Sequence, residues 1–598
     1  MSITQILQNG LSGITASQAG LATVSQNIAN ANTIGYSKQS LSFVQRVIDG
    51  VNSGVSAGII TRAVDTFLVR ELQARQASQG EAEVVSTFYS NIQTRFGTPS
   101  GNNSLSADLS RFGAALETLS INPEDPALRF NVVSASISVA RSINDLATSV
   151  QTMRRQADTG ITDTVNEINS QLRTLFKLNN AITLIRAQGG VSAGLEDQRD
   201  IAVTALSKNI SITSFTSTNG ALTIMAEGGL TLLDTEVREL EYTPAAVVNE
   251  GTLFGAIKLF RLNADGERLG ASKELVSSGV SSAVVSTVNG GRLKGFLDVR
   301  DSVLPDLGAQ ITVLADTVRT EYNAVHNSGS SFPAINSLTG TRAVTTGDAF
   351  AATGNLRIAV VNADGTLAVD AVDIDLTGIA NVGDLAAAIN TALDALGIDG
   401  GTAAIINGNL VIAAKDPTMG IAINDSLVTG MTQGFSHFFG LNDFFVGGAT
   451  GTDFAVRPDI IDDPSHVSMG TLSLTATLVG ESGISVGDNS VITALSSLTQ
   501  KNVTFAAVAG LPAGNFILED YAGLILGLNA VQAARAEASA ELETDLLENL
   551  EFRKASLTGV NIDEELANIL VFQNSFAASA RVIGAAQELF DNLLGLVR

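Results

Sequence analysis

The residues that most often carry chemistry are few and scattered in this chain of 598 residues. Its histidines, His326, His437 and His466, lie far apart, and none falls in a metal-binding spacing such as H-E-x-x-H. His437 stands in "FSHFFGLNDFF" (435–445), where five Phe favour a core position. The chain has no Cys, which excludes disulfides, thiolate metal sites and Cys nucleophiles. We therefore expect no catalytic, cofactor-binding or metal-binding residue, and a protein that is not an enzyme.

Three other motifs resemble sites only superficially. "GGRLKG" (290–295) has glycines without a phosphate-loop spacing, so we expect a loop before a strand or helix. The two "NADG" stretches, 263–266 and 362–365, do not continue into a calcium-ligand pattern and are predicted to be hairpin turns. Asp373 and Asp375 lie two residues apart on a predicted strand, which is typical of a solvated face. Hydrolysis by paired carboxylates has no positive support here.

The charge of the chain is strongly negative and unevenly placed. The net charge of −25 argues against binding to nucleic acid or to an anionic membrane surface. Residues 340–518 contain 17 acidic and 5 basic side chains, whereas residues 1–37 contain no charged side chain. The N-terminal segment lacks the basic and continuous apolar regions of a signal peptide, and polar residues interrupt it too often for a membrane span. If the protein is exported, we expect export without a cleaved signal peptide.

The N-terminal segment has a helical pattern over residues 3–30. Apolar residues recur every seven positions, at Leu7, Ile14, Leu21 and Ile28. The interior glycines Gly10, Gly13 and Gly20 each cost an isolated helix about 1 kcal/mol relative to Ala. Such a helix is marginal alone, so the segment needs a packing partner.

The C-terminal segment has the same seven-residue period. It appears at Ile569, Phe576, Ile583, Phe590 and Val597. "GVN" (559–561) ends the preceding helix, and three acidic residues follow where they favour a helix N-terminus. We predict that these five residues and the four of the N-terminal segment form an assembly seam. The simpler alternative is a coiled coil within one chain.

The middle of the chain predicts a helical body with β-rich parts. Helical patterns cover 62–96, 104–121, 127–157, 161–187, 301–326 and 519–557, with a shorter one at 382–397. Strand patterns fill most of 206–291 and 340–518. The expected fold class is multidomain α+β, with coiled-coil-like terminal helices, a helical rod body and β-rich outer domains inserted in the middle. The predicted domains are terminal helices (1–57 and 558–598), a helical rod (58–205, 292–330 and 519–557), a β-rich domain (206–291 and 451–518) and a variable outer insert (331–450).

Two motifs at the ends resemble a known family. "SQNIANANTIGYSKQ" (25–39) is similar to the N-terminal signature of the axial proteins of the bacterial flagellum, namely rod, hook and hook-associated proteins. "GVNIDEELANILVFQNSFAASARVIGAAQELFDNLL" (559–594) resembles their C-terminal signature. The signature turn would comprise Asn27, Asn30, Asn32, Gly35 and Tyr36.

Further motifs point to one branch of these proteins, the hook-associated protein 1 family. They include "NPEDPALR" (122–129), "LEDQRDIAVTALS" (195–207), "GGRLKGFLDVRDSVLP" (290–305) and "FAVRPDIIDDPSHVS" (454–468). Ile34 departs from the family, which often has Pro there.

The resemblance implies a structural subunit that joins hook to filament and polymerises through its terminal helices. The implied partners are copies of itself in a ring, the hook protein, a second junction protein on the filament side and an export chaperone at the C-terminal segment. The implied location is the extracellular flagellum. Two alternatives remain at this point: a hook or distal rod subunit, and an exported adhesin with flagellar axial ends whose activity lies in 331–518.

Overall fold

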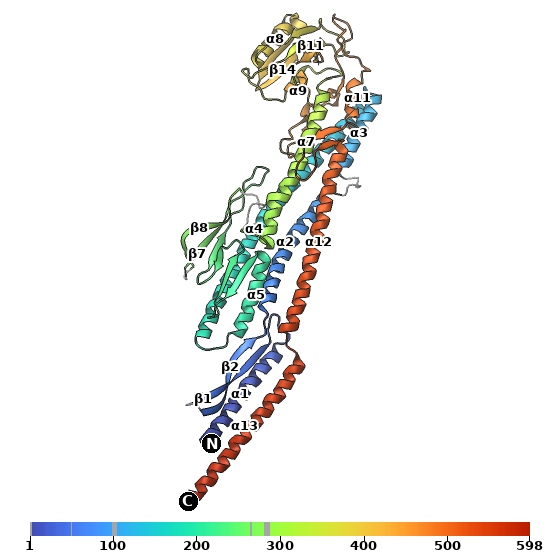
Figure 1. The fold of residues 1–598 in the computed structure, drawn as a ribbon. Helices are drawn as coiled ribbons and strands as arrows, with labels where there is room; N and C mark the ends of the chain where they lie inside the picture. Colours follow the sequence, from blue (N-terminus) through green and yellow to red (C-terminus); the bar gives the residue numbers. More distant parts are fainter. Residues whose placement is uncertain (1–2, 49–50, 98–103, 264–265, 280–286, 598) are drawn as a thin grey trace.

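The protein is an elongated molecule with both chain ends at one tip and a compact β-rich domain at the other (Figure 1). The computed structural model describes residues 3–48, 51–97, 104–263, 266–279 and 287–597. Long helices run between the two tips, so segments distant in sequence lie side by side. The fold is multidomain α+β, as predicted.

The helical body is built from helices that line two hydrophobic cores. They are α2 (Thr66–Phe96), α3 (Leu105–Ile121), α4 (Pro126–Ala187), α5 (Ala193–Asn209), α6 (Gly291–Asp298), α7 (Leu304–His326) and α12 (Leu518–Thr558). Helix α4 is continuous where the sequence suggested a break near residue 160. The reason is packing: Gly160 lies against the ring of Phe296, so the glycine serves close approach and does not end the helix.

Helix α6 begins inside the "GGRLKG" motif, so the expectation of a loop there is wrong except at Gly290, which precedes the helix. A π-helical turn (Val299–Val303) joins α6 to α7 without a break. Gly291 has φ of +85° and its Cα lies against the backbone of Asn209, which leaves no room for a side chain.

Two small antiparallel sheets cover α4, α5 and α6 on one side of the body. The first contains β3 (Ile212–Thr216), β4 (Leu222–Ala226) and β5 (Thr231–Leu233). The second contains β6 (Arg238–Glu241), β7 (Ile257–Leu262) and β8 (Arg268–Val276). The first "NADG" stretch connects the paired strands β7 and β8, as predicted for a hairpin turn, although residues 264–265 lie outside the described part.

The outer domain contains two antiparallel sheets and one longer helix. Its strands are β10 (Ser337–Thr339), β11 (Thr353–Val361), β12 (Val372–Asp375), β13 (Gly401–Ile406), β14 (Asn409–Ala414), β15 (Gly420–Asn424) and β16 (Val428–Thr429). Its helices are α8 (Val382–Asp394), a 3-10 turn (Gly397–Asp399) and α9 (Phe435–Phe439). The second "NADG" stretch is a tight turn, closed by the Asn362 N–H on the Thr366 carbonyl (2.8 Å).

The carboxylates Asp373 and Asp375 are both exposed, as predicted for a solvated face. Asp373 accepts two hydrogen bonds from the Arg357 guanidinium (2.7 and 2.8 Å). Asp375 is exposed and accepts from the Thr377 N–H (2.8 Å).

The boundaries predicted for the outer insert and the β-rich domain need correction. Residues 441–470 return to the helical body and form β17 (Phe445–Val446), β18 (Ala455–Val456), α10 (Pro458–Asp462), a 3-10 turn (Pro464–His466) and β19 (Ser468–Gly470), which pairs with β9 (Ser330–Ser331). Residues 489–518 also join the body, through α11 (Ser490–Ser497), β20 (Val503–Phe505) and β21 (Gly514–Phe516). Residues 206–291 belong to a different hydrophobic cluster, so they do not form one domain with 451–518.

Between these returning parts, residues 471–486 form an irregular strap over the outer domain. Leu472, Ala476 and Ile484 pack against Ala359, Val361, Leu367 and Ala422 on the second face of the β11 sheet. The strap therefore belongs with residues 332–440. Because the strap has no hydrophobic periodicity, its packing on the outer sheet could not be predicted from the sequence.

The terminal unit contains α1 (Ile3–Ala29), β1 (Gln39–Ile48), β2 (Val51–Arg62) and α13 (Ile562–Val597). Strands β1 and β2 form an antiparallel hairpin with two register shifts. The domain prediction assigned 1–57 to terminal helices, so the hairpin corrects it. Alternation of Ser and Gly with β-branched residues favours the strands.

Candidate assembly site at the terminal helices

Helices α1 and α13 lie side by side in opposite directions at the lower tip (Figure 1). The glycines of α1 lie at their contact. A Cβ added at Gly20 would lie 2.7 Å from the ring of Phe572, and one added at Gly10 would lie 2.7 Å from the side chain of Ile583. Gly13 lies against Ser579 in the same way. The glycines that weaken the isolated helix therefore let α13 approach closely.

The structure places the predicted seam residues in two groups. On α13, Ile569, Phe576 and Ile583 are half-buried, and Phe590 is 50% exposed. The side chain of Val597 lies outside the described residues.

On α1, the predicted row is half-buried at the border of the contact and not at its centre; it consists of Leu7, Ile14, Leu21 and Ile28. The centre contains the glycines, so the sequence prediction missed Phe572 and Ser579 as their counterparts. A second seven-residue row, Phe572, Ser579 and Ala586, was the available signal.

A buried polar cluster closes the upper end of the pair. The Asn27 amide donates to the Gln39 carbonyl (2.8 Å) and to the Glu565 carboxylate (3.1 Å). The Asn27 side-chain oxygen accepts from the Tyr36 hydroxyl (2.8 Å) and from the Gln39 N–H (3.0 Å). Burial, with the charges of Asp197 and Glu565, raises the pKa of Tyr36 to about 12, so the phenol remains a donor. Asn27 thus joins α1, β1 and α13.

The other residues of the signature turn have local roles. The Asn30 amide donates to the Gln26 carbonyl (2.9 Å), and its side-chain oxygen accepts from the Thr33 hydroxyl (3.2 Å). Gly35 has φ of +81° and lies against the side chain of Ile201, so a larger residue would be strained there. Asn32 is exposed.

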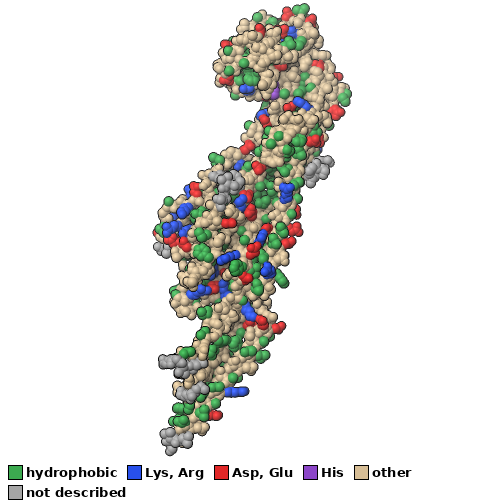
Figure 2. Space-filling view, viewed as in Figure 1, with side chains coloured by type: hydrophobic (Ala, Val, Ile, Leu, Met, Phe, Trp, Pro, Cys, Tyr) green, Lys and Arg blue, Asp and Glu red, His purple; other side chains and the backbone are tan. Residues whose placement is uncertain are grey.

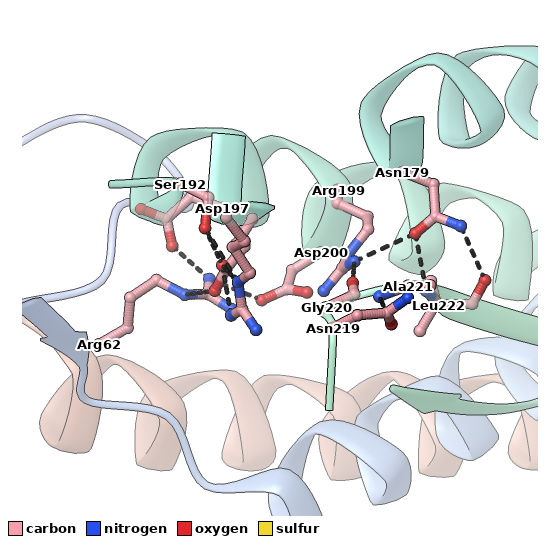
Figure 3. Close-up of polar contacts among 12 residues, drawn as sticks. Arg62, Asn179, Ser192, Asp197, Arg199, Asp200, Asn219, Gly220, Ala221 and Leu222 are labelled. Atoms are coloured by element: carbon pink, nitrogen blue, oxygen red, sulfur yellow. Dashed lines mark hydrogen bonds and ion pairs between the residues drawn. The ribbon is translucent and has the colours of Figure 1, made fainter. Parts of the chain in front are cut away.

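An ionic cluster fixes the hairpin to α5 of the helical body (Figure 3). The Arg62 guanidinium contacts three carboxylates, those of Glu196 (3.1 Å), Asp197 (2.6 Å) and Asp200 (2.9 Å). The second oxygen of Asp197 accepts from the Ser37 N–H (3.3 Å). Burial opposes ionisation of Glu196, but hydrogen bonds from Ser192 and Arg186 and the charge of Arg62 outweigh it and hold its pKa below the usual value.

The neighbouring Arg199 extends this cluster toward the first sheet (Figure 3). Its guanidinium donates to the Gly220 carbonyl (2.7 Å) and to the Asn179 side chain (3.3 Å). A cleft of about 560 Å³ lies beside the cluster, between β2 and the α4–α5 connection. The charged side chains that face this cleft pair with one another, because Arg62 and Arg186 both contact Glu196. These ion pairs hold the hairpin on the helical body.

The outer surface of the terminal pair is apolar and nearly uncharged. Figure 2 shows hydrophobic side chains with few charged ones over the lower tip. Exposed apolar residues of α13 are Ile562, Leu566, Leu570, Val571, Val582, Leu589, Phe590, Leu593 and Leu594. Among the described residues, one helical stretch between Leu518 and Gly595 is long and apolar enough to cross a membrane, by length and composition only. A single stretch of this kind is weak evidence for a membrane span. An apolar surface of this kind marks a site of association.

The three histidines have separate surroundings. His326 is fully buried, and its Nδ1 lies 2.6 Å from the Asn442 carbonyl oxygen. His437 is half-buried beside a Phe cluster, and burial lowers its pKa. His466 lies 3.7 Å from Asp463. Among the residues that the structure describes, no group of three or more His, Asp or Glu side chains could hold a metal ion.

Comparison with known proteins agrees with this geometry. A family model for the helical domain of flagellar hook-associated protein FlgK matches residues 89–337. Models for the flagella basal body rod protein and for the flagellar basal body rod FlgEFG protein C-terminal region match residues 7–36 and 556–596, the two terminal helices. Flagellar hook-associated protein 1 of Escherichia coli K12 is 25% identical, over 99% of this chain and all of the relative. The helical-domain model and this full-length relative both support the flagellar hook-associated protein 1 family.

Other relatives extend the same likeness. Flagellar hook-associated protein 1 of Bacillus subtilis 168 is 21% identical, over 98% of this chain and 97% of the relative. The solved structure of the flagellar hook junction protein FlgK from Burkholderia pseudomallei has a TM-score of 0.52 and 15% identity, and covers 81% of this chain and all of that one. The resemblance predicted from the end motifs together with the motifs of the helical body is therefore confirmed, and the family is a structural one.

Proposed function

We propose that this protein is a structural, non-enzymatic subunit of the bacterial flagellum that joins hook to filament. The observation that carries the proposal is the terminal pair α1–α13, whose apolar outer surface has no partner within the described chain. A single chain leaves this surface in water, and burial against neighbours offsets the cost of ordering two weak helices.

The absence of charge suits the same role. No side chain from residue 1 to 37 is charged, so this segment can be buried among neighbours without stranding a charge at low dielectric. The acidic outer domain lies at the opposite tip, where it can face solvent. Export through the flagellar route, without a cleaved signal peptide, places the protein in the extracellular flagellum.

The proposed partners follow from this position. Copies of the chain form a ring, the hook protein lies on one side, and a second junction protein lies on the filament side. An export chaperone binds the C-terminal segment before assembly and covers its apolar surface.

The proposal is tested by placing a carboxylate in the seam. Ile583→Asp and Phe590→Asp cost several kcal/mol wherever the charge is buried by assembly. Filament attachment should fail in cells that carry either variant, while thermal unfolding of the helical body is unchanged. Secretion is measured separately, because the chaperone uses the same segment. Asn574→Asp, at an exposed position of the same helix, is the matched control and should support filaments.

Because Ile583 packs against Gly10 within the chain, a loss of stability in the purified Ile583→Asp monomer would report that contact, whereas the half-exposed Phe590 tests the outer surface. Normal filaments with both variants would contradict the proposed role of the seam.

A further inference from the structure

Two apolar rows border the α1–α13 contact. The first row, on α1, is half-buried and consists of Leu7, Ile14, Leu21 and Ile28. The second row, on α13, consists of Val571, Val582, Leu589 and Leu593, which are 58%, 44%, 52% and 53% exposed. We call them the α1 row and the α13 row. Neither has its full apolar surface covered in the single chain.

The position of each row follows from helix geometry. Residues of an α-helix advance by about 100° each, which places the α1 row roughly 80° from the line through Gly10, Gly13 and Gly20. The α13 row lies roughly 95° from the line through Phe572 and Ile583 that meets those glycines. Because both helices are right-handed and run in opposite directions, these two rotations bring the rows to opposite sides of the pair.

The hairpin leaves the α1 row open. It contacts α1 on another side, where Gly54 lies against Ser12 and Asn9 and the Val55 N–H donates to the Ser12 hydroxyl (3.2 Å). Ser12 is about 190° around the helix from the middle of the α1 row. The hairpin therefore does not compete for that row.

We propose that the α1 row of one copy packs on the α13 row of the next copy. Two different apolar surfaces on opposite sides of one unit make a heterologous contact, which repeats around a ring or along a helix and does not stop at a dimer. The occupant of each row is thus a second copy of this chain. The inference rests on the proposed function, because it assigns the contact that the assembly requires.

Cysteine cross-linking in assembled flagella tests the contact, because the chain has no Cys of its own. Leu21→Cys is combined with Val571→Cys, Val582→Cys or Leu589→Cys, three positions that cover the unknown stagger between copies. Each variant replaces the natural gene, and hook–filament structures are oxidised and separated without reductant. At least one pair should give a ladder of two, three and more linked chains, and each single-cysteine variant should remain monomeric.

The control pair is Leu21→Cys with Asn574→Cys, whose second position lies on the polar side of α13 and should give no ladder. Dimers from a single α13 cysteine would show that like rows meet, and an equal ladder from the control would show no preference; either result overturns the proposal. If the unmodified protein restores filaments and none of the three pairs gives a ladder, the contact is wrong and the function stands. A ladder from a protein that filaments do not need would support the contact and contradict the function.

Discussion

His326 shows how one buried side chain fixes the neck between the helical body and the outer domain. Its Nε2 accepts from the Ser468 N–H (2.8 Å), so Nδ1 carries the proton and donates to the Asn442 carbonyl oxygen (2.6 Å). This pattern requires a neutral ring. Burial lowers the pKa of His326 to about 4, with the nearby Arg457 acting in the same direction.

The pH dependence follows with a definite sign. The unfolded chain binds a proton near pH 6.5, whereas the folded chain binds it only near pH 4. The stabilisation is complete above about pH 6.5 and is lost as pH falls toward 4, by on the order of 3 kcal/mol. His326→Gln removes this titration, so its free energy of unfolding should fall less between pH 7 and pH 4.5 than that of the parent, whatever its level at pH 7. Chemical denaturation of both proteins at the two pH values measures this, and equal losses would contradict it.

The elements of the terminal unit show which features the sequence could reveal. The apolar periods predicted both helices, and their ends agree with the structure within a few residues. From the sequence, the glycines of α1 were expected only to destabilise the helix, because helix propensity describes an isolated helix. In the structure a second helix packs against them. The hairpin 39–62 was not predicted, although its alternating residues favour strands.

Gly20→Ala separates helix propensity from packing. The methyl group should raise the helicity of a peptide of residues 1–37, by about 1 kcal/mol in the helix interior. In the whole protein it would lie 2.7 Å from the Phe572 ring, so α13 must shift and assembly should weaken. Circular dichroism of the peptide and the fraction of hooks that carry filaments measure the two effects.

Ser25→Ala, at an exposed position of α1, is the control and should raise helicity without loss of filaments. A Gly20→Ala strain with normal filaments would contradict the close-packing account.

At the scale of the whole molecule, the sequence predicted the order of helical and β-rich parts but not which parts pack together. Phe444 and Phe445 look like members of the outer insert, yet they lie in the core of the helical body beside Phe112. The strap 471–486 has no periodic pattern, so only the folded arrangement reveals its packing on the outer sheet. Contacts between distant, irregular segments leave little trace in a single sequence.

This arrangement defines how the outer domain can be removed. Each of the two segments to be removed begins and ends at points that lie close together. The Asn442 amide donates to the Gly329 carbonyl (3.1 Å), and the Thr471 N–H donates to the Asp488 carboxylate (2.9 Å). Replacing 332–440 and 472–486 by short Gly/Ser linkers should leave a soluble, secreted protein that still joins hook to filament. Replacing 332–440 alone exposes Leu472, Ala476 and Ile484, and should reduce solubility. A secreted, soluble double replacement that yields hooks without filaments would show that the outer domain is part of the joint.

Joining of hook to filament is the central claim, and electron microscopy of a strain that lacks the gene tests it most directly. We expect completed hooks without attached filaments, filament protein released into the medium, and recovery of filaments when the intact gene is returned. Cells without the gene that still carry normal filaments on their hooks would contradict it.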